Sequence, residues 1–266
     1  MKKICIPRNV EWILDELEKN GYEAYAVGGC VRDSLLGREP KDWDVTTSAR
    51  PQDVKRIFRN TYDTGIEHGT VSVRIGTEIF EVTTFRVDGD YSDHRRPDSV
   101  EYTDKLAEDL KRRDFTMNAM AYHPRVGVVD LFGGQEDLKK GCIRCVGDPE
   151  ERFEEDALRM LRAYRFAARF GFFVEEETAR AVREKAPLLD SVSRERVREE
   201  MDRLVCAGHP GILRDVCKSG LMSYILPEWT PCEGAPQNTP YHIYTVDEHL
   251  IRTVEASQPI RVVRWA

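Results

Sequence analysis

Hydrophobic and polar positions along the first part of the chain switch between a helical and an extended pattern. Apolar residues recur at helical spacing from Val10 to Leu17, and Gly21 follows as a residue that commonly ends a helix. Short strands are expected at 25–27 and 42–46, where hydrophobic residues lie in brief extended runs. The chain is thus expected to begin with alternating helices and strands.

Two further short helices and a hairpin are expected next. The helices lie at 31–36 and 51–58, and the second begins with a proline, which suits the first turn of a helix. Alternating apolar residues at 71–75 and 80–83 predict two strands, and the glycine-threonine pair between them predicts a two-residue turn. Residues 86–100 are polar with charges of both signs, so a mobile loop is expected there.

The pattern becomes helical in the second half. Residues 150–226 show successive helical periods with few strand signals. Apolar positions from Val197 to Val205 lie on one face of a helix, and Ser193 is its expected N-cap. The fold class is therefore α+β: a mixed sheet with flanking helices over 1–148, then an all-helical region over 149–226.

Residues 227–266 form a third segment, a proline-rich linker followed by the start of another helical region. Its last apolar residues predict a surface that associates with a second copy of the chain, as a homodimer. These residues are Ile260, Val262, Val263 and Trp265.

Composition narrows the function classes. The 266 residues carry a net charge of −7, which argues against a protein that simply coats nucleic acid, although a local basic stripe can still bind RNA. Seven cysteines, an odd number, favour reduced thiols in the cytoplasm. No apolar run approaches the roughly 20 residues that span a bilayer, so no membrane partner is expected.

Candidate chemistry begins at a glycine pair and two nearby acids. Gly28 and Gly29 precede a helix, where backbone N–H groups can cradle phosphate oxygens. Asp42 and Asp44 share one face of an extended segment. Mg²⁺ prefers one or two carboxylates together with substrate phosphates, so this order predicts a nucleotidyl transferase with a two-metal mechanism.

Two further residues extend this site, each with an alternative role. Arg32, one turn into the helix, can reach the phosphates or pair with a nearby carboxylate. Glu81 can assist the metals or accept the proton of an attacking 3′-hydroxyl, but a lone strand glutamate is about as often solvated.

A second group of candidates lies at 112–119. Its adjacent arginines and the polar residues behind them, among them Arg113, Asp114 and Asn118, suit contact with a triphosphate and a ribose. The alternative, a helix N-terminus with solvated arginines, is equally consistent with the pattern.

A third group forms one stripe of an expected helix over 152–170, with four arginines and a single acid. The stripe is expected to carry uncompensated positive charge for an anionic ligand; the alternative is a solvated face with helix ion pairs. Its members are Asp156, Arg159, Arg162, Arg165 and Arg169.

The first acid and arginine of this stripe can read a base. An Asp accepts from the amino groups of cytosine and adenine, and an Arg donates to ring nitrogens. The pair Asp156 and Arg159 can therefore accept C and A and reject U and G.

From 25 to 205 the chain resembles the class II tRNA nucleotidyltransferases, the CCA-adding enzymes, and the related bacterial poly(A) polymerases. The likeness lies in GGxVRD at 28–33 with DxD at 42–44, in RRDFTMNA at 112–119 and in EDALR at 155–159. RERV at 194–197 falls where a helix-supporting motif is expected. The resemblance implies a nucleotidyltransferase head followed by a helical neck, and an incomplete HD-like body domain at the end.

The resemblance also implies roles and partners. Asp42 and Asp44 would hold Mg²⁺ and, with Glu81, act in catalysis, while CMP and AMP pass from CTP and ATP to a tRNA 3′ end as the sequence CCA. The nucleotide would be bound by Gly28, Gly29, Arg32, Arg113, Asp114, Asn118, Asp156, Arg159, Arg162 and Arg165.

Two alternatives stay open. One is a poly(A) polymerase, although GIEHGT at 65–70 resembles CCA-adding members. The loop at 88–98 resembles the flexible element needed for the switch to A addition, which argues against an enzyme that adds only CC. The other is a truncated chain that binds nucleotides without efficient transfer to tRNA.

Overall fold

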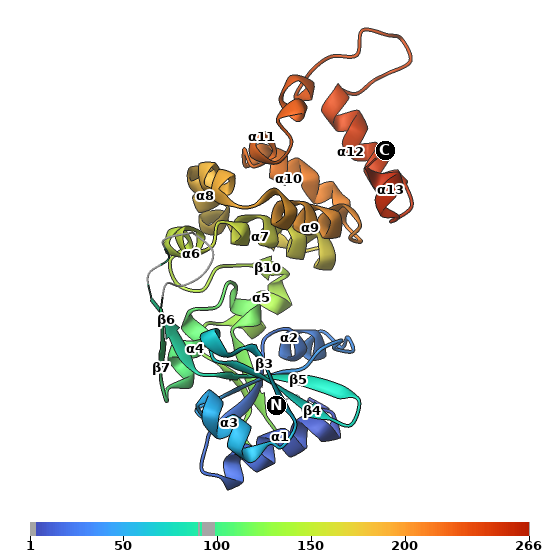
Figure 1. Ribbon diagram of the computed structural model, residues 1–266. Coiled ribbons are helices and arrows are strands. Elements are labelled where there is room, and N and C mark those ends of the chain that lie inside the picture. Colours follow the sequence, from blue (N-terminus) through green and yellow to red (C-terminus); the bar gives the residue numbers. More distant parts are fainter. Residues whose placement is uncertain (1–3, 90, 92–98, 266) are drawn as a thin grey trace. The chain divides into compact units, whose positions relative to one another are not determined.

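The computed structural model describes residues 4–89, 91 and 99–265. Apart from Tyr91, the described residues form one compact unit up to Lys140 and a second from Gly141 onward. Each unit is described by itself below (Figure 1).

The first unit is built on a mixed seven-stranded sheet in the order β3-β4-β5-β2-β1-β8-β9. Only the β2–β5 ladder of this sheet is parallel among the described strands. The strands are β1 (Ala24–Val27), β2 (Asp44–Thr47), β3 (Thr61–Gly65), β4 (Thr70–Ile75), β5 (Glu78–Thr84), β8 (Met120–His123) and β9 (Gly127–Asp130).

Helices cover this sheet and supply much of its core. The apolar stripe of α1 is buried from Val10 to Leu17, and α1 packs against α3 and the first strands (Figure 1). The helices are α1 (Arg8–Lys19), α2 (Gly29–Leu35), α3 (Pro51–Ile57), α4 (Leu106–Lys111) and α5 (Gly134–Lys140), with 3-10 turns at Ile66–His68 and Thr116–Asn118.

Most sequence-predicted elements of this unit are confirmed. In the hairpin, Ile75 pairs with Glu78, which leaves the expected two-residue turn. The helix after β1 begins two residues earlier than expected, at Gly29. The strand expected at 42–46 begins only at Asp44, so Asp42 lies just before it.

The stretch expected to be a mobile loop contains regular structure at both ends. β6 (Arg86–Asp88) pairs antiparallel with β7 (Val100–Tyr102), so the prediction is wrong there. The largely buried side chains of Arg86 and Asp88 pair with each other over 2.8 Å, and Asp88 also lies 3.5 Å from Arg112. Residues 90 and 92–98, within the loop expected at 88–98, lie outside the described residues.

The second unit is almost entirely helical, as expected. A short parallel pair, β10 (Cys142–Ile143) with β11 (Phe173–Val174), is the exception among its described residues. Its helices are α6 (Pro149–Glu155), α7 (Leu158–Phe170), α8 (Glu176–Lys185), α9 (Arg194–Val205), α10 (Leu213–Lys218), α11 (Met222–Ile225), α12 (Val246–Ala256) and α13 (Arg261–Arg264), with 3-10 turns at Ala186–Ser191, Pro210–Ile212 and Pro227–Cys232.

Two details of this unit differ from expectation. Ser193 is the N-cap residue of α9, but its side chain makes no capping hydrogen bond. The segment expected to be only a linker carries a 3-10 turn at Pro227–Cys232. The apolar residues Ile260 to Trp265 are largely exposed, and no helix among the described residues is long and apolar enough to cross a membrane.

Candidate nucleotidyl-transfer site

The glycine pair forms the sharp connection between β1 and α2. Gly28 has φ of +77°, a conformation that side-chain-bearing residues rarely adopt, and its N–H donates to the carbonyl of Met120 over 3.1 Å. A Cβ at Gly28 would also lie 3.0 Å from Nη1 of Arg113. The turn thus brings the Arg113 guanidinium directly against the backbone at the start of α2.

The three predicted acids gather beside this turn. Asp44 opens β2 and is the parallel register partner of Glu81 on β5, while Asp42 lies two residues upstream. Although Asp44 is exposed, the protein atoms near its carboxyl raise its pKa, and the charges of Glu81 and Asp42 raise it further, against the opposing charge of Arg113. Three acids with one nearby arginine leave a negative charge that a bound cation would offset.

Too few protein side chains are grouped at this site to bind a metal ion without other ligands. Among the described residues, no three His, Cys, Asp or Glu side chains are grouped so as to hold a metal ion by themselves. Asp42 and Asp44 remain candidates for a Mg²⁺ whose other ligands are water and substrate phosphates, the coordination that Mg²⁺ favours.

Arg32 takes the paired arrangement rather than an open one. Its side chain is buried, with Nε donating to Asp33 over 2.8 Å and Nη1 donating to Oδ1 of Asn118 over 2.6 Å. Asn118 in turn donates to Asp114 over 3.0 Å. Three predicted nucleotide-binding residues, Arg32, Asp114 and Asn118, are therefore joined in one chain of hydrogen bonds.

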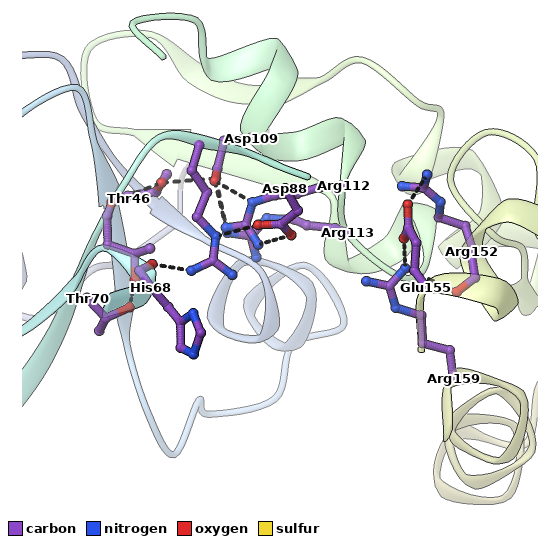
Figure 2. A network of polar contacts seen from close by, with 12 residues as sticks. Thr46, His68, Thr70, Asp88, Asp109, Arg112, Arg113, Arg152, Glu155 and Arg159 are labelled. Carbon is purple, nitrogen blue, oxygen red and sulfur yellow. Dashed lines mark hydrogen bonds and ion pairs between the residues drawn. The ribbon is translucent and has the colours of Figure 1, made fainter. Parts of the chain in front are cut away.

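Asp109 is the residue of this site that sequence reasoning missed. It is fully buried on α4 and accepts hydrogen bonds from Arg112 at 3.0 and 2.7 Å, from Arg113 at 3.4 Å and from Thr46 at 3.0 Å (Figure 2). Burial alone would raise the Asp109 pKa, but the two arginines and the hydrogen bonds outweigh it and hold the pKa below its usual value. An acid followed by arginines three and four residues later was the available signal.

The same network reaches the strands at 86–102. Arg112 lies 3.5 Å from Asp88, and Asp88 pairs with Arg86 over 2.8 Å. Arg86 also donates to the carbonyl of His68 (Figure 2). The segment 112–119 therefore follows a helix and is anchored by buried ion pairs, so the alternative of a solvated helix N-terminus is wrong.

The second unit carries the predicted base-reading pair, on a backbone different from that expected. The helix expected over 152–170 is broken: α6 ends at Glu155, Asp156 is extended with φ −143° and ψ 101°, and α7 starts at Leu158. Asp156 Oδ1 accepts from the Leu158 N–H over 3.1 Å. Asp156 thus binds the N–H of the first residue of α7 from the junction between the two helices, and it is not a member of a helical stripe.

Arg159 is held by acids and carbonyls of its own unit. Its Nη1 donates to Glu155 and, over 3.3 Å, to the carbonyl of Arg152 (Figure 2). The guanidinium of Arg152 also pairs with Glu155, over 2.5 Å. Asp156 pairs instead with Arg196 of α9, over 3.0 Å. The structure therefore holds Asp156 and Arg159 on separate partners.

The remaining arginines of the stripe also have partners within the fold. Arg165 forms an ion pair with Glu200, and its guanidinium lies 4.0 Å from the Phe166 ring centre. The guanidinium of Arg162 lies 5.9 Å from the centre of the Phe166 ring. The guanidinium of Arg169 lies 4.9 Å from the centre of the Phe170 ring. The expectation of uncompensated charge is therefore wrong for Arg159 and Arg165, because Glu155 and Glu200 come from other elements of the fold.

Comparison with known proteins points in one direction. Residues 24–144 match the family described as the poly A polymerase head domain, and residues 171–233 match a probable RNA and SrmB-binding site of polymerase A. The CCA-adding enzyme of Limosilactobacillus reuteri (strain DSM 20016) is 49% identical over 213 residues, which cover 80% of this chain and 53% of that enzyme. That of Lactobacillus helveticus (strain DPC 4571) is 53% identical over 197 residues, covering 74% and 49%.

Solved structures agree. The Bacillus stearothermophilus CCA-adding enzyme in complex with CTP matches with a TM-score of 0.78 at 40% identity, over 96% of this chain and 57% of that one. The Thermotoga maritima CCA-adding enzyme complexed with tRNA matches with a TM-score of 0.67 at 26% identity, over 88% and 55%. The chain spans about half the length of the curated relatives it matches. Residues 24–144 therefore belong to the family described as the poly A polymerase head domain, and the chain is similar to the CCA-adding enzymes.

Proposed function

We propose that this chain adds the 3′-terminal CCA to tRNA, by transfer of CMP and AMP from CTP and ATP with release of pyrophosphate. The observation that carries the proposal is the grouping of Asp44 with Glu81, Asp42 and Arg113 beside the Gly28 turn. Similarity to CCA-adding enzymes, one of them described in complex with CTP and another with tRNA, supports the same substrates.

Mg²⁺ is the proposed metal, held by Asp42 and Asp44. When bound there together with the triphosphate, it would supply Lewis-acid stabilisation of the charge that develops at the reacting phosphate. Glu81, the register partner of Asp44, is proposed to accept the proton of the attacking 3′-hydroxyl. Arg113 offers positive charge to the triphosphate while Asp109 holds its guanidinium.

The base is proposed to be chosen by Asp156 and Arg159. Cytosine and adenine each carry an exocyclic amino group, which the carboxylate of Asp156 would accept as a hydrogen-bond donor. The guanidinium of Arg159 would donate to a ring nitrogen of the same base. Uracil and guanine would place an acceptor oxygen against the carboxylate, which leaves both groups without a donor. Arg162 and Arg165, further along α7, are proposed to contribute nucleotide contacts from the same unit.

A poly(A) polymerase is the second candidate, because the family that matches residues 24–144 is named for that activity. The two functions differ in product and in substrate. A CCA-adding enzyme stops after three nucleotides on tRNA, whereas a poly(A) polymerase extends unrelated RNA with A alone. Binding of nucleotides without transfer to tRNA is a third outcome, since the chain spans about half of its curated relatives.

The proposal is tested by transfer of labelled CMP from CTP to a tRNA transcript that lacks CCA. We expect incorporation with Mg²⁺, loss of incorporation after chelation and recovery when Mg²⁺ is returned. An unrelated RNA of equal length serves as the control acceptor. Incorporation that is insensitive to chelation, or equal on both RNAs, would contradict the proposal.

A further inference from the structure

One ion pair joins the base-reading carboxylate to a different helix. Nη2 of Arg196 lies 3.2 Å from Oδ1 and 3.0 Å from Oδ2 of Asp156, forty residues away in the sequence. The two side chains are only 23% and 14% exposed. The contact is therefore largely withdrawn from water, where charge-assisted hydrogen bonds have a stronger orienting effect.

Both partners are mounted on rigid parts of the unit. Asp156 is fixed between α6 and α7, with its carbonyl accepting from the Arg159 N–H over 2.9 Å. Arg196 lies in the first turn of α9, whose buried Val197 and Met201 anchor the helix. The orientation of the carboxylate is thus set by the position of α9 relative to the α6–α7 junction, within one unit.

The two oxygens of Asp156 are used unequally. Among the described residues, Oδ1 accepts from the Leu158 N–H and from Arg196, whereas Oδ2 accepts only from Arg196. An ionised carboxylate offers about four acceptor positions, two on each oxygen. Oδ2 therefore keeps the capacity to accept one more hydrogen bond, such as one from an exocyclic amino group.

We infer that Arg196 is a positioning residue for base selection, which holds Asp156 so that Oδ2 accepts the amino group of cytosine or adenine. This inference rests on the proposed function. Arg196 acts through Asp156 and makes no contact with the base itself. Its effect is on the preference for C over U and for A over G.

The competing explanation is that the ion pair only joins α9 to the α6–α7 junction. A purely structural link would lower stability when broken, but would leave the ratio of affinities for different bases unchanged. The ratio of affinities is therefore the informative quantity. It is calculated from equilibrium dissociation constants measured for CTP, UTP, ATP and GTP, and transfer to a tRNA that lacks CCA is measured alongside.

Two substitutions and one control make the test. Arg196→Gln removes the charge and is expected to lower the C-over-U and A-over-G ratios by about tenfold. Arg196→Lys keeps a charge without the planar guanidinium, so a loss of about threefold is expected. Arg198→Ala removes an arginine of the same helix that is 69% exposed and 4.0 Å from its acid, and the ratios should not change.

The outcomes separate cleanly. Folding of each Arg196 variant is checked by circular dichroism. If a folded variant keeps the C-over-U and A-over-G ratios of the wild type, the inference is overturned and the proposed function still stands. A wild-type chain without any base preference would overturn the base-reading proposal and this inference with it. A wild-type chain that binds with preference but does not transfer would contradict only the proposed activity.

Discussion

At the scale of single residues, the proposed reaction depends most on the two acids proposed to bind the metal. Asp42 is exposed, and its charge contributes to the raised pKa of Asp44. Asp42→Asn should therefore leave folding intact while it removes a proposed metal ligand. We predict a fall in CMP transfer of roughly a thousandfold, as several kcal/mol of lost stabilisation implies.

The matched control for this prediction is Asp63→Asn. Asp63 is another exposed acid of the first unit, paired with Lys55 over 2.9 Å on the surface. Transfer by the Asp63 variant should equal that of the wild type, with both rates taken under saturating CTP. Retained transfer in the Asp42 variant would remove this residue from the metal site.

Base choice gives a second prediction at this scale. Arg159→Ala removes the donor proposed to reach a ring nitrogen, so selection between bases should relax more than turnover slows. The measurement is single-nucleotide addition with CTP, UTP, ATP and GTP offered separately. A variant that slows all four equally, with its order of preference intact, would show that Arg159 is not a base reader.

Asp109 gives a prediction about stability and pH. Its folded-state pKa is lowered, so its contribution is complete above the usual value of 3.8 and is lost as pH falls through the folded value. Asp109→Asn leaves two arginines without their buried acid and should lower the free energy of unfolding at pH 7 by about 3 kcal/mol.

Thermal unfolding from pH 7 to pH 3 checks this sign. The difference between wild type and the Asp109 variant should be largest at neutral pH and shrink below about pH 4. A difference that stayed constant across this range would mean that ionisation of Asp109 contributes nothing to the stability of the fold.

At the scale of elements, the glycine turn between β1 and α2 is sensitive to a single added methyl group. Gly28→Ala meets both an unfavourable φ of +77° and the Arg113 guanidinium at 3.0 Å. We predict a loss of stability of about 1 kcal/mol or more and a raised KM for CTP, because Arg113 must shift.

Gly76→Ala is the matched control, since Gly76 has φ of +61° in the β4–β5 turn with nothing within 4 Å of an added Cβ. It should lower stability in the same way without changing the KM for CTP. Equal KM values for the Gly28 variant and the wild type would mean that Arg113 does not contact the triphosphate.

The elements also show what local patterns can and cannot predict. The hairpin at 70–84 and the first helix follow from periodicity, because their side-chain patterns match one buried face. The break at Asp156 has no proline or glycine to mark it, and this acid, which accepts from the first N–H of α7, was instead counted in a helical stripe. The preference of aspartate for the starts of helices was the signal available.

Long-range partners were beyond reach of the sequence. Motif spacing placed Asp44, Glu81 and Arg113 as candidates, and the sheet register and the Gly28 turn then bring them together. Glu200 on Arg165 and Arg196 on Asp156 lie 35 and 40 residues away in sequence, so no local periodicity predicts these pairs. The sequence identified the candidate residues, and the structure was needed to show which of them pair with each other.

At the scale of the whole molecule, two compact units carry different parts of the proposed reaction. The first holds the acids proposed to bind the metal and the arginine proposed to meet the triphosphate, and the second holds the pair proposed to read the base. In the proposed function, ordered addition of C, C and A depends on residues of both units. The sequence of the product therefore tests the proposed roles together.

The most direct test is to sequence the 3′ ends formed on a tRNA that lacks CCA, with Mg²⁺ and with CTP and ATP supplied separately and together. The account predicts ends that stop at CC with CTP alone and at CCA with both nucleotides. Long tracts of A would instead indicate a poly(A) polymerase, and unextended ends despite CTP binding would contradict tRNA transfer by this chain.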